Sequence, residues 1–401
     1  MTDSHQYPYG RAGEIIYKAL AALRRFFWYS TPMPTSFVRR LLRLTLRAAV
    51  ILLCFGFVLS AFSGHVSPVS CGGYWGTLLL SFPLWLSALL IAMLITLWAD
   101  RRFFLLCVAC VLVSWDAVTD YCPMNPGFTH PRPDPESVTF TMMTYNVSSF
   151  CDMRTGKIVR STTPIMEYIL SKDVDILCLQ ETEPMNSNGF KYFDRALLDS
   201  LFTRYPYRIF GASMQGILSK YPIERIPIDS ASYKESGDVI GVIADIGGVP
   251  VSLFDIHLMS LGLSESDREL YRDLTGLKRE SIGDVRTHLL SKISLANVRR
   301  ERQAEFLVNN IRKFATPTAV VCGDFNDVTG CYSMNLLERE GFRDVYSEVG
   351  FGPMITFNAR RFYFCIDHVM YRGRLRPLKM DKGKSRVSDH YPLVATFELT
   401  E

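Results

Sequence analysis

Three long apolar stretches near the N-terminus constrain this chain more than any other feature of its sequence. They lie at about 48–63, 74–99 and 103–118, and only the third contains a charged residue, Asp116. The second is long enough to cross about 30 Å of hydrocarbon by itself, whereas the other two need their polar flanks to complete a span. Composition agrees, because a mean hydropathy of +0.10 is high for a purely soluble chain. The sequence therefore predicts three transmembrane helices.

Two other interpretations of these stretches are weaker. One isolated apolar run of this length is as typical of a buried core helix as of a membrane helix, but three in succession are not typical of a soluble core. A cleaved signal peptide is disfavoured because the first run begins late and two more follow it.

The positions of Lys and Arg predict how these helices are oriented. The segment 1–43 is basic, the loop 64–73 has neither Lys nor Arg, and Arg101 and Arg102 precede the third stretch. Basic residues stay inside, so three spans place everything that follows on the outside. We expect a multi-pass protein of the inner (cytoplasmic) membrane whose C-terminal part lies in the periplasm. If the third stretch did not cross, that part would face the cytoplasm instead.

The chain divides into four parts by composition. They are a basic cytoplasmic segment at 1–43, a membrane region at 44–122, a Pro-rich linker at 123–137 and a C-terminal domain at 138–401. Residues 1–137 carry 11 Lys and Arg against 7 Asp and Glu, whereas the C-terminal domain carries 33 of each. A domain without net charge lacks the basic excess of proteins that grip nucleic acid without sequence preference.

The pattern beyond the linker predicts a layered domain. Runs rich in β-branched, aromatic and aliphatic residues indicate strands at 137–145, 174–179, 216–219, 239–246, 251–257, 318–322, 362–371 and 393–399. Helices are expected at 162–171 and 297–314. Strands that dominate, with helices between them, indicate a layered α+β or α/β sandwich.

Polar residues follow several of these strands directly. Asn146 follows the first strand, Glu181 follows the second, and His257 ends the fifth. Each has an ordinary structural explanation, such as a turn or a half-buried strand position. A carboxylate at the end of a buried strand is nevertheless well placed to hold a hard cation such as Mg²⁺, which prefers oxygen ligands.

Three further polar motifs occupy the second half of the domain. Asp324 and Asn326 form a Gly-Asp-x-Asn turn after a buried strand, Asp367 lies within an aromatic strand, and Asp389 and His390 are adjacent in a loop. A buried acid is costly without a partner. Taken together, these groups suit phosphodiester hydrolysis, which needs a cation, a base for water and donors for the developing oxyanions.

The order of these motifs resembles the endonuclease/exonuclease/phosphatase superfamily, the deoxyribonuclease-I-like proteins, and in particular its membrane-anchored bacterial branch. The motifs are Tyr-Asn-Val at 145–147, Leu-Gln-Glu at 179–181, Ile-Leu-Ser-Lys-Tyr-Pro-Ile at 217–223, His-Leu at 257–258, Gly-Asp-Phe-Asn-Asp at 323–327, Ile-Asp-His at 366–368 and Ser-Asp-His-Tyr-Pro at 388–392. The resemblance implies an α+β fold, a four-layered α/β/β/α sandwich of two mixed sheets, here preceded by the three-helix transmembrane region.

The resemblance also implies which residues hold the metal. Glu181 would be the main ligand of Mg²⁺, or alternatively Mn²⁺, with Asn146 beside it and Asp389 as a further carboxylate. No other cofactor is implied.

Five more residues would act on water and phosphate by the same resemblance. Asp324 would orient or deprotonate the attacking water, and Asn326 would hydrogen-bond the scissile phosphate. His390 and His257 would contact the phosphate, and Asp367 would hold His390 in orientation.

The resulting hypothesis is a membrane-anchored, Mg²⁺-dependent hydrolase of a phosphodiester or phosphomonoester. The expected partners are the lipid bilayer and a phosphoester substrate, whether a lipid, a small molecule or a nucleic acid, and no protein partner can be inferred. One alternative is a catalytically inactive scaffolding module with the same fold. Another, within the enzyme class, is a nuclease.

Two segments have no role in this scheme. Residues 259–295 form a long insertion, and a packed amphipathic hairpin is its simpler interpretation. The functional alternative is a lid over the substrate or a surface that lies on the membrane. The basic stretch 372–386 is expected to be a solvated hairpin or a guide for an anionic substrate.

Overall fold

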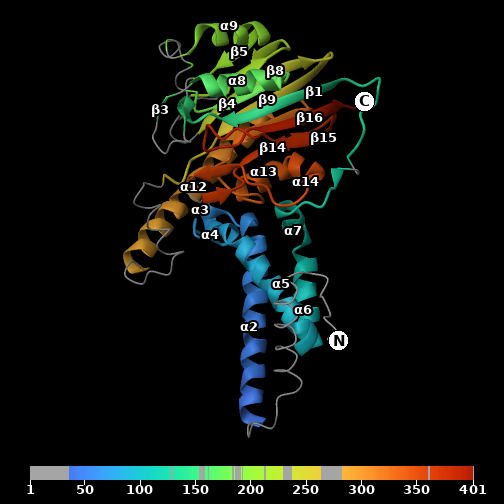
Figure 1. Cartoon of the computed structure of the whole chain (residues 1–401), viewed down its shortest axis with the longest axis vertical. Coiled ribbons are helices and arrows are strands. Elements are labelled where there is room, and N and C mark those ends of the chain that lie inside the picture. The colour runs from blue at the N-terminus through green and yellow to red at the C-terminus, as the bar shows by residue number, and fades with distance from the viewer. Residues whose placement is uncertain are drawn as a thin grey trace, which may run out of the picture. The chain divides into compact units, whose positions relative to one another are not determined.

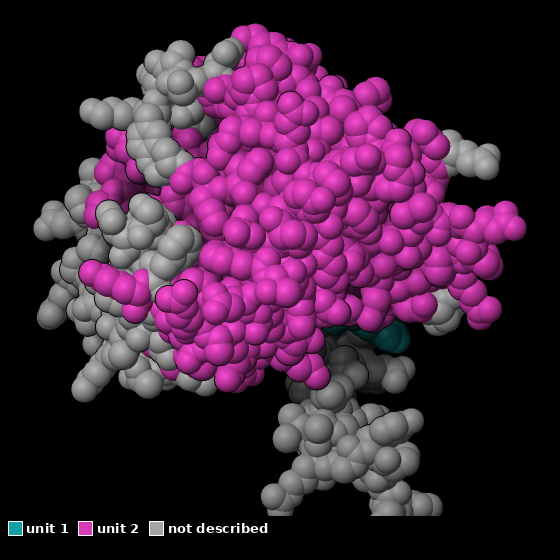
Figure 2. Space-filling view, turned by 90° about the horizontal axis from the view of Figure 1, so that it is seen from above, with its two compact units in different colours: residues 1–58, 83–113 teal, residues 59–82, 114–401 magenta. Residues whose placement is uncertain are grey.

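The chain folds into two units. One holds residues up to 58 together with 83–113, and the other holds 59–82 and 114–401 (Figure 2). The computed structural model (Figure 1) describes residues 36–127, 130–152, 159–160, 162–182, 185, 191, 193–211, 214–228, 237–262, 282–359 and 362–400. The structure thus places residues 59–82, which include the end of the first apolar stretch and the start of the second, in the same unit as the C-terminal domain.

The first unit is helical. It is built from α2 (Ser36–Phe62), α5 (Phe82–Ala99) and α6 (Arg101–Val113), of which α2 and α5 extend into the second unit by a few residues. Arg47 on α2 forms an ion pair of 2.8 Å with Asp100, and its guanidinium lies over the ring of Phe103. These contacts tie α2 to the segment between α5 and α6.

Two helices in the described part are long and apolar enough to cross a membrane. They are Arg39–His65 and Phe82–Ala99, and a third exists if α6 and the following α7 (Trp115–Tyr121), which are separated by a bend, together form one span. Apolar helices of this length are typical of membrane association.

The second apolar stretch is divided rather than continuous. Residues 74–99 form α4 (Trp75–Leu80) and, after a break at Ser81, α5. Pro83 explains the position of the break, because proline has no amide hydrogen and is tolerated in the first turn of a helix but not in its interior. The candidate span therefore starts eight residues later than the hydropathy pattern predicts, at Phe82.

The second unit contains two six-stranded mixed sheets. Sheet one has the order β15 (Leu375–Lys382), β16 (Leu393–Leu399), β1 (Thr139–Asn146), β4 (Ile176–Gln180), β6 (Gly216–Ser219) and β5 (Tyr207–Phe210). Sheet two has the order β11 (Arg343–Asp344), β14 (Asp367–Arg372), β10 (Ala319–Asp324), β9 (Val249–His257), β8 (Asp238–Ile246) and β7 (Ile223–Arg225). Each sheet has one parallel pair at its centre, β1 with β4 and β9 with β10.

Smaller elements complete this unit. Two-stranded pairs are β2 (Cys151–Asp152) with β3 (Val159–Arg160) and β12 (Phe357–Ala359) with β13 (Phe362–Phe364). The helices are η1 (Ser63–His65), α3 (Pro68–Cys71), α4, α7, η3 (Ser148–Phe150), α8 (Thr162–Lys172), α9 (Arg195–Arg204), α12 (Ile282–Phe314), α13 (Tyr332–Arg339) and α14 (Val345–Val349).

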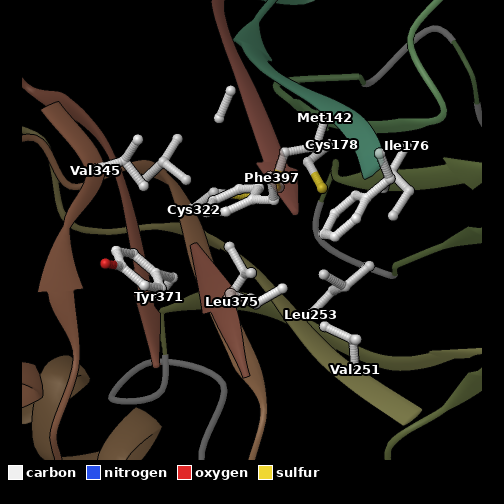
Figure 3. Close-up of a cluster of buried hydrophobic side chains, with 14 of the residues drawn as sticks. Met142, Ile176, Cys178, Val251, Leu253, Cys322, Val345, Tyr371, Leu375 and Phe397 are labelled. Atoms are coloured by element: carbon white, nitrogen blue, oxygen red, sulfur yellow. The ribbon is translucent and has the colours of Figure 1, made fainter. Parts of the chain in front are cut away.

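Strand alternation distributes the apolar residues over three cores. In β1, Met142 faces the core between the sheets, whereas Met143 faces the opposite side, where α8 and α9 pack. In β10, Cys322 joins the inter-sheet core (Figure 3) and Val321 faces the core shared with α12 and α13. Helices, sheet, sheet and helices therefore form four layers, which confirms the predicted fold class.

The predicted elements agree with the structure where apolar periodicity is strong. The strand predicted at 216–219 is β6 without change, and β8, β9, β10 and β16 lie within two residues of their predicted bounds. The strand β15 is hard to recognise in the sequence because a register shift between Pro377 and Lys379 interrupts the alternation of its buried and exposed residues. The basic stretch 372–386, predicted to be a solvated hairpin or a guide for an anionic substrate, thus contains an edge strand of sheet one.

The predicted insertion at 259–295 coincides only partly with described residues. Residues 263–281 lie outside them, and from Ile282 onward the insertion forms the first half of α12. The amphipathic helix predicted at 297–314 is therefore the C-terminal half of a helix of 33 residues.

A buried carboxylate at the start of α14 makes the stability of this unit depend on pH. Asp344 caps α14 by accepting from the amide of Ser347 at 2.9 Å, yet its Oδ1 has no hydrogen-bond partner among the described residues. Burial, reinforced by the charge of Asp120, raises the pKa of Asp344 to about 7. The folded chain thus retains this proton at pH values where the unfolded chain has lost it, so the group lowers stability as pH rises from about 4 to 7.

We predict that Asp344→Asn raises the midpoint of thermal unfolding by roughly 5 °C or more at pH 8 and leaves it nearly unchanged at pH 4. Asparagine caps a helix as well as aspartate does, so only the charge is removed. Differential scanning fluorimetry of the full chain in detergent measures the effect. Asp344→Ala, which also removes the cap, should lower the midpoint at pH 4; an equal gain for Asp344→Asn at both pH values would contradict the assignment.

Candidate active site

The polar residues predicted from the sequence meet at one edge of the two sheets. Asn146 ends β1 beside Gln180 at the end of β4, and His257 ends β9 beside Asp324 at the end of β10. Because both pairs of strands are parallel, their carboxyl ends share an edge. The chain therefore brings Asn146 into hydrogen-bonding contact with Asp324, which lies 178 residues further along the sequence.

Asn146 connects the two sheets at this edge. Its side-chain amide donates to Oε1 of Glu181 at 2.9 Å and to Oδ2 of Asp324 at 3.0 Å, while its Oδ1 accepts from the amide of Ser148. Asn146 and Asp324 are buried, and Glu181 remains about one-third exposed. The arrangement leaves the carboxylate of Glu181 accessible to solvent and buries the carboxylate of Asp324.

Three residues of the site adopt backbone conformations with positive φ. Glu181 has φ 53° and Asn326 has φ 52°, a region that residues with side chains seldom occupy. Gly323 has φ 135°, and a Cβ there would lie 2.0 Å from the carbonyl oxygen of Ile256, so only glycine fits. Such conformations cluster at functional sites, where the surrounding structure enforces them.

The turn after β10 places both of its polar side chains at the site. The amide of Asn326 donates to Oδ1 of Asp324 at 2.8 Å, and its side chain donates to the carbonyl of Leu258 at 2.9 Å. Asp324 is thereby held by Asn146 on one oxygen and by the turn on the other.

Two imidazoles flank the Asp324 carboxylate. Nε2 of His257 and Nε2 of His390 each lie 3.7 Å from its Oδ2, and Nε2 of His257 also lies 3.8 Å from Glu181. On the far side of its ring, Nδ1 of His390 lies 2.9 Å from Oδ2 of Asp367. The second carboxylate therefore fixes the orientation of His390 and leaves Nε2 to face the site.

Burial and charge act in opposite directions on these groups. Burial alone would lower the pKa of His390, but the charges of Asp367 and Asp324 outweigh it and raise that pKa to about 10. Burial raises the pKa of Asp324, an effect that the neighbouring His390 imidazolium opposes. The site thus holds a positively charged imidazole beside a carboxylate that accepts a proton more readily than an exposed one.

The sequence from residue 143 to residue 390 matches the Endonuclease/Exonuclease/phosphatase family. The chain belongs to this family. Its members are phosphoester hydrolases. The matched segment contains Asn146, Glu181 and every other residue described at the site, up to His390.

The fold is also similar to solved structures at low sequence identity. An endonuclease/exonuclease/phosphatase from Beutenbergia cavernae is 14% identical over 66% of this chain and 72% of its own, with a TM-score of 0.42. An AP endonuclease from Archaeoglobus fulgidus is 19% identical over 64% and 98%, at 0.41, and the human Nocturnin catalytic domain is 17% identical over 69% and 100%, at 0.42. No curated protein matches the sequence.

The residues at the site suit a divalent cation, as the family implies. Two sets of groups have ligand atoms within 4.8 Å of one another, Glu181 with His257 and Asp324, and Asp324 with Asp367 and His390. Glu181 offers a partly exposed carboxylate, and carboxylate oxygens are the ligands that Mg²⁺ and Mn²⁺ prefer. The chemistry of the donor set therefore fits a hard divalent ion beside Glu181.

The expected metal ligands differ in their surroundings. Asn146 and Glu181 are in direct contact, whereas Asp389 is half-buried and its carboxylate lies 3.5 Å from the hydroxyl of Ser388. Among the described residues, Asp389 is in neither set of close ligand atoms. Its role as a ligand stays a prediction.

Sequence reasoning missed two residues that support the site. Ser388 donates its hydroxyl to the carbonyl of Asn146 at 2.8 Å and accepts from the amide of His390 at 3.1 Å, and so joins the two motifs. The ring of Phe357 lies edge-on to His390 with 4.9 Å between ring centroids. The serine stood within the Ser-Asp-His motif, but nothing in the sequence placed Phe357 beside it.

His368, the third histidine, has a different environment. It is buried, its Nε2 lies 3.1 Å from the carbonyl oxygen of Asp327, and burial lowers its pKa to about 4. It is therefore neutral at ordinary pH and braces the turn after β10.

We predict that Asp367→Asn lowers the pKa of His390 by two units or more, because burial then acts without the carboxylate that opposes it. The carbon-13 shift of the labelled imidazole, followed by NMR over pH 5 to 11 in the full chain, measures this, and His390→Gln assigns the signal. Asp199→Asn, an exposed change on α9, should leave the titration unaltered. A His390 pKa that stayed near 10 in Asp367→Asn would show that another group holds the proton.

Proposed function

We propose that this chain is a membrane-anchored, divalent-metal-dependent hydrolase that cleaves a phosphodiester or phosphomonoester bond by attack of an activated water. The observation that carries the proposal is the position of Asp324, buried between Asn146, Asn326 and two imidazoles. A bound Mg²⁺ or Mn²⁺ would neutralise charge on the phosphate. Glu181 and Asn146 would hold it, with Asp389 as a further ligand.

Asp324 has the properties of the group that activates water. Its pKa is raised by burial, and general bases work best when their pKa approaches the operating pH. One of its oxygens faces both histidines, and the other accepts from the Asn326 amide, which limits its rotation. A fixed carboxylate needs no reorganisation to take a proton from a water beside the phosphorus.

The histidines and Asn326 supply donors for the negative charge that develops on the phosphate. Because Asp367 keeps its imidazole protonated, His390 can donate from Nε2 to a phosphate oxygen and give a proton to the leaving oxygen. His257 ends the neighbouring strand β9, lies against the same carboxylate and offers a second contact. Asn326 lies on the same turn and completes the donors.

The alternative of an inactive scaffold is disfavoured by the cost of this arrangement. Asn146, Asp324, Asp367 and His390 are all buried and polar, and each would weaken the fold if it served no chemistry.

The proposed substrate class follows from the charge of the C-terminal domain and from the apolar helices that precede it. A domain with equal numbers of acidic and basic residues, joined to apolar helices, favours a lipid or an extracytoplasmic phosphoester over a nucleic acid.

The direct test is hydrolysis by the full chain in detergent or nanodiscs. A panel of DNA, RNA, phosphoinositides, sphingomyelin and a generic phosphodiester should contain at least one substrate that is cleaved with Mg²⁺ and not with EDTA. Activity that persists in EDTA, or no cleavage of any phosphoester, would overturn the proposal.

We predict that Asp324→Asn lowers kcat by on the order of a hundredfold or more, because it keeps the size of the side chain and removes the base. Steady-state kinetics on whichever substrate the panel yields measures the loss. Asp199→Asn, which removes an exposed carboxylate on α9, serves as the matched control and should retain full turnover. Near-complete turnover by Asp324→Asn would assign water activation to another group.

We further predict that the hydrolase domain faces the periplasm, since the Lys and Arg pattern retains 1–43 and Arg101–Arg102 inside. Alkaline phosphatase fused after Glu136 should be active, and green fluorescent protein fused there should be dark. The same two reporters fused after Gly73 should give the same result, because a loop between two crossings that start from the cytoplasm also lies in the periplasm. The reverse reporter pattern after Glu136 would mean two spans and a cytoplasmic substrate.

A further inference from the structure

The connection between α2 and α5, residues 63–81, is built into the second unit. Leu79 of this α2–α5 connection belongs to the apolar core that sheet two shares with α12 and α13. Its backbone approaches α12 so closely that a Cβ on Gly73 would lie 2.0 Å from the carbonyl oxygen of Ser294. A hydrophilic turn between two membrane helices needs no such fit, so the packing indicates a specific interface.

Two buried side chains of α12 satisfy the backbone of the connection. Glu301 is 3% exposed and accepts from the hydroxyl of Ser67 at 2.6 Å and from the amide of Val69 at 2.5 Å. Asn297 is 4% exposed and donates to the carbonyl of Gly73 at 2.6 Å. Truncating either would leave buried polar groups without partners.

The same turn of α12 carries an arginine that contacts the loops after β9 and β10. Asn297, Arg300 and Glu301 are spaced by three and four residues and so share one face of the helix. Arg300 is 2% exposed, and its Nη2 donates to Oδ1 of Asn297, the side chain that holds Gly73. The amide group of Asn297 therefore contacts the connection with one atom and Arg300 with the other.

Arg300 binds the two loops that directly follow the active-site residues His257 and Asp324. Its Nε donates to Oδ2 of Asp327 at 3.1 Å, directly after Asn326, and its Nη1 donates to the carbonyl of Met259 at 3.1 Å, two residues after His257. These loops follow β10 and β9. A rigid guanidinium donating to three acceptors fixes the relative positions of the groups that bind it.

We propose that the α2–α5 connection is a working part of the hydrolase, and that Arg300 is a positioning residue through which it holds the His257 and Asp324 loops. Docking of residues 63–81 orders Asn297 and Glu301, Asn297 orders Arg300, and Arg300 sets the spacing of the loops. An enzyme cut off before residue 138 would lack this brace. The kinetic part of the proposal rests on the proposed function, and the structural part does not.

The structural part is tested by hydrogen exchange and mass spectrometry on the full chain in nanodiscs. Gly73→Ala forces a side chain into the interface, and Ser67→Ala removes one donor to Glu301. Both should speed exchange of the amides of Leu258, Phe325 and Val328 by about threefold or more, while those of Met142 and Cys178 in sheet one keep their protection. Should Gly73→Ala fail to fold, Ser67→Ala, which deletes only a hydroxyl, decides the question.

Matched controls exist for both changes. A Cβ on Gly127 meets nothing within 4 Å, and Ser70 is exposed, so Gly127→Ala and Ser70→Ala should leave the site amides unchanged. Faster exchange confined to residues 63–81, with the site amides unaffected, would overturn the proposal. So would an equal loss of protection throughout both sheets, because that is general destabilisation.

Kinetics separates positioning from folding. Arg300→Lys retains the charge opposite Asp327 but cannot reach three acceptors at once, so kcat should fall about tenfold or more with KM little changed. Ser67→Ala should show a smaller loss of the same kind, and Ser70→Ala none. A raised KM with unchanged kcat in Arg300→Lys would contradict positioning of the reacting groups. If the wild-type chain cleaves no phosphoester, the proposed function fails, and the exchange experiment alone decides this inference.

Discussion

The side-chain amide of Asn146 is the interaction on which the geometry of the site depends. It donates to Glu181 from its own sheet and to Asp324 from the other, so it joins the two layers where their parallel strands end. That meeting is possible because each sheet has a central parallel pair, β1 with β4 and β9 with β10, whose carboxyl ends lie at one edge. The four-layered packing then buries the amide and makes its two hydrogen bonds hard to replace with water.

Around this amide, neighbouring charges oppose the effect of burial on the pKa values of His390 and Asp324. Asp367 keeps His390 protonated in a position where an isolated imidazole would be neutral, and His390 in turn partly compensates Asp324. Glu181 and Asn326 hold positive φ angles beside these groups. A chain that keeps buried charge and backbone strain at one edge of an otherwise regular sandwich has the features expected of a catalytic site.

The residues that connect the apolar helices belong to the same unit as the two sheets, although their composition does not predict this. The residues between the first two apolar helices pack as η1, α3 and α4 against α12 and α13, and the Pro-rich segment beyond α7 is also held, since Asn125 donates to the carbonyl of Ser347. Apolar helices in the sequence suggest an anchor attached by a linker. The hydrogen bonds of Glu301 and Asn297 instead make the residues between the two apolar helices part of the folded unit that carries the site.

Sequence alone determined the apolar helices, the strands with strong alternation, and the identity of the polar residues at the ends of β1, β4, β9 and β10. These follow from local pattern, because periodicity and turn chemistry are properties of neighbouring residues. The family resemblance added the pairing of Asp367 with His390. Only the tertiary structure decided that Ser388 and Phe357 support the site, that 372–386 contains an edge strand, and that Arg300 joins the α2–α5 connection to the loops after His257 and Asn326. Each depends on contacts between segments far apart in the chain, and no local pattern of residues encodes which distant segment will supply the partner.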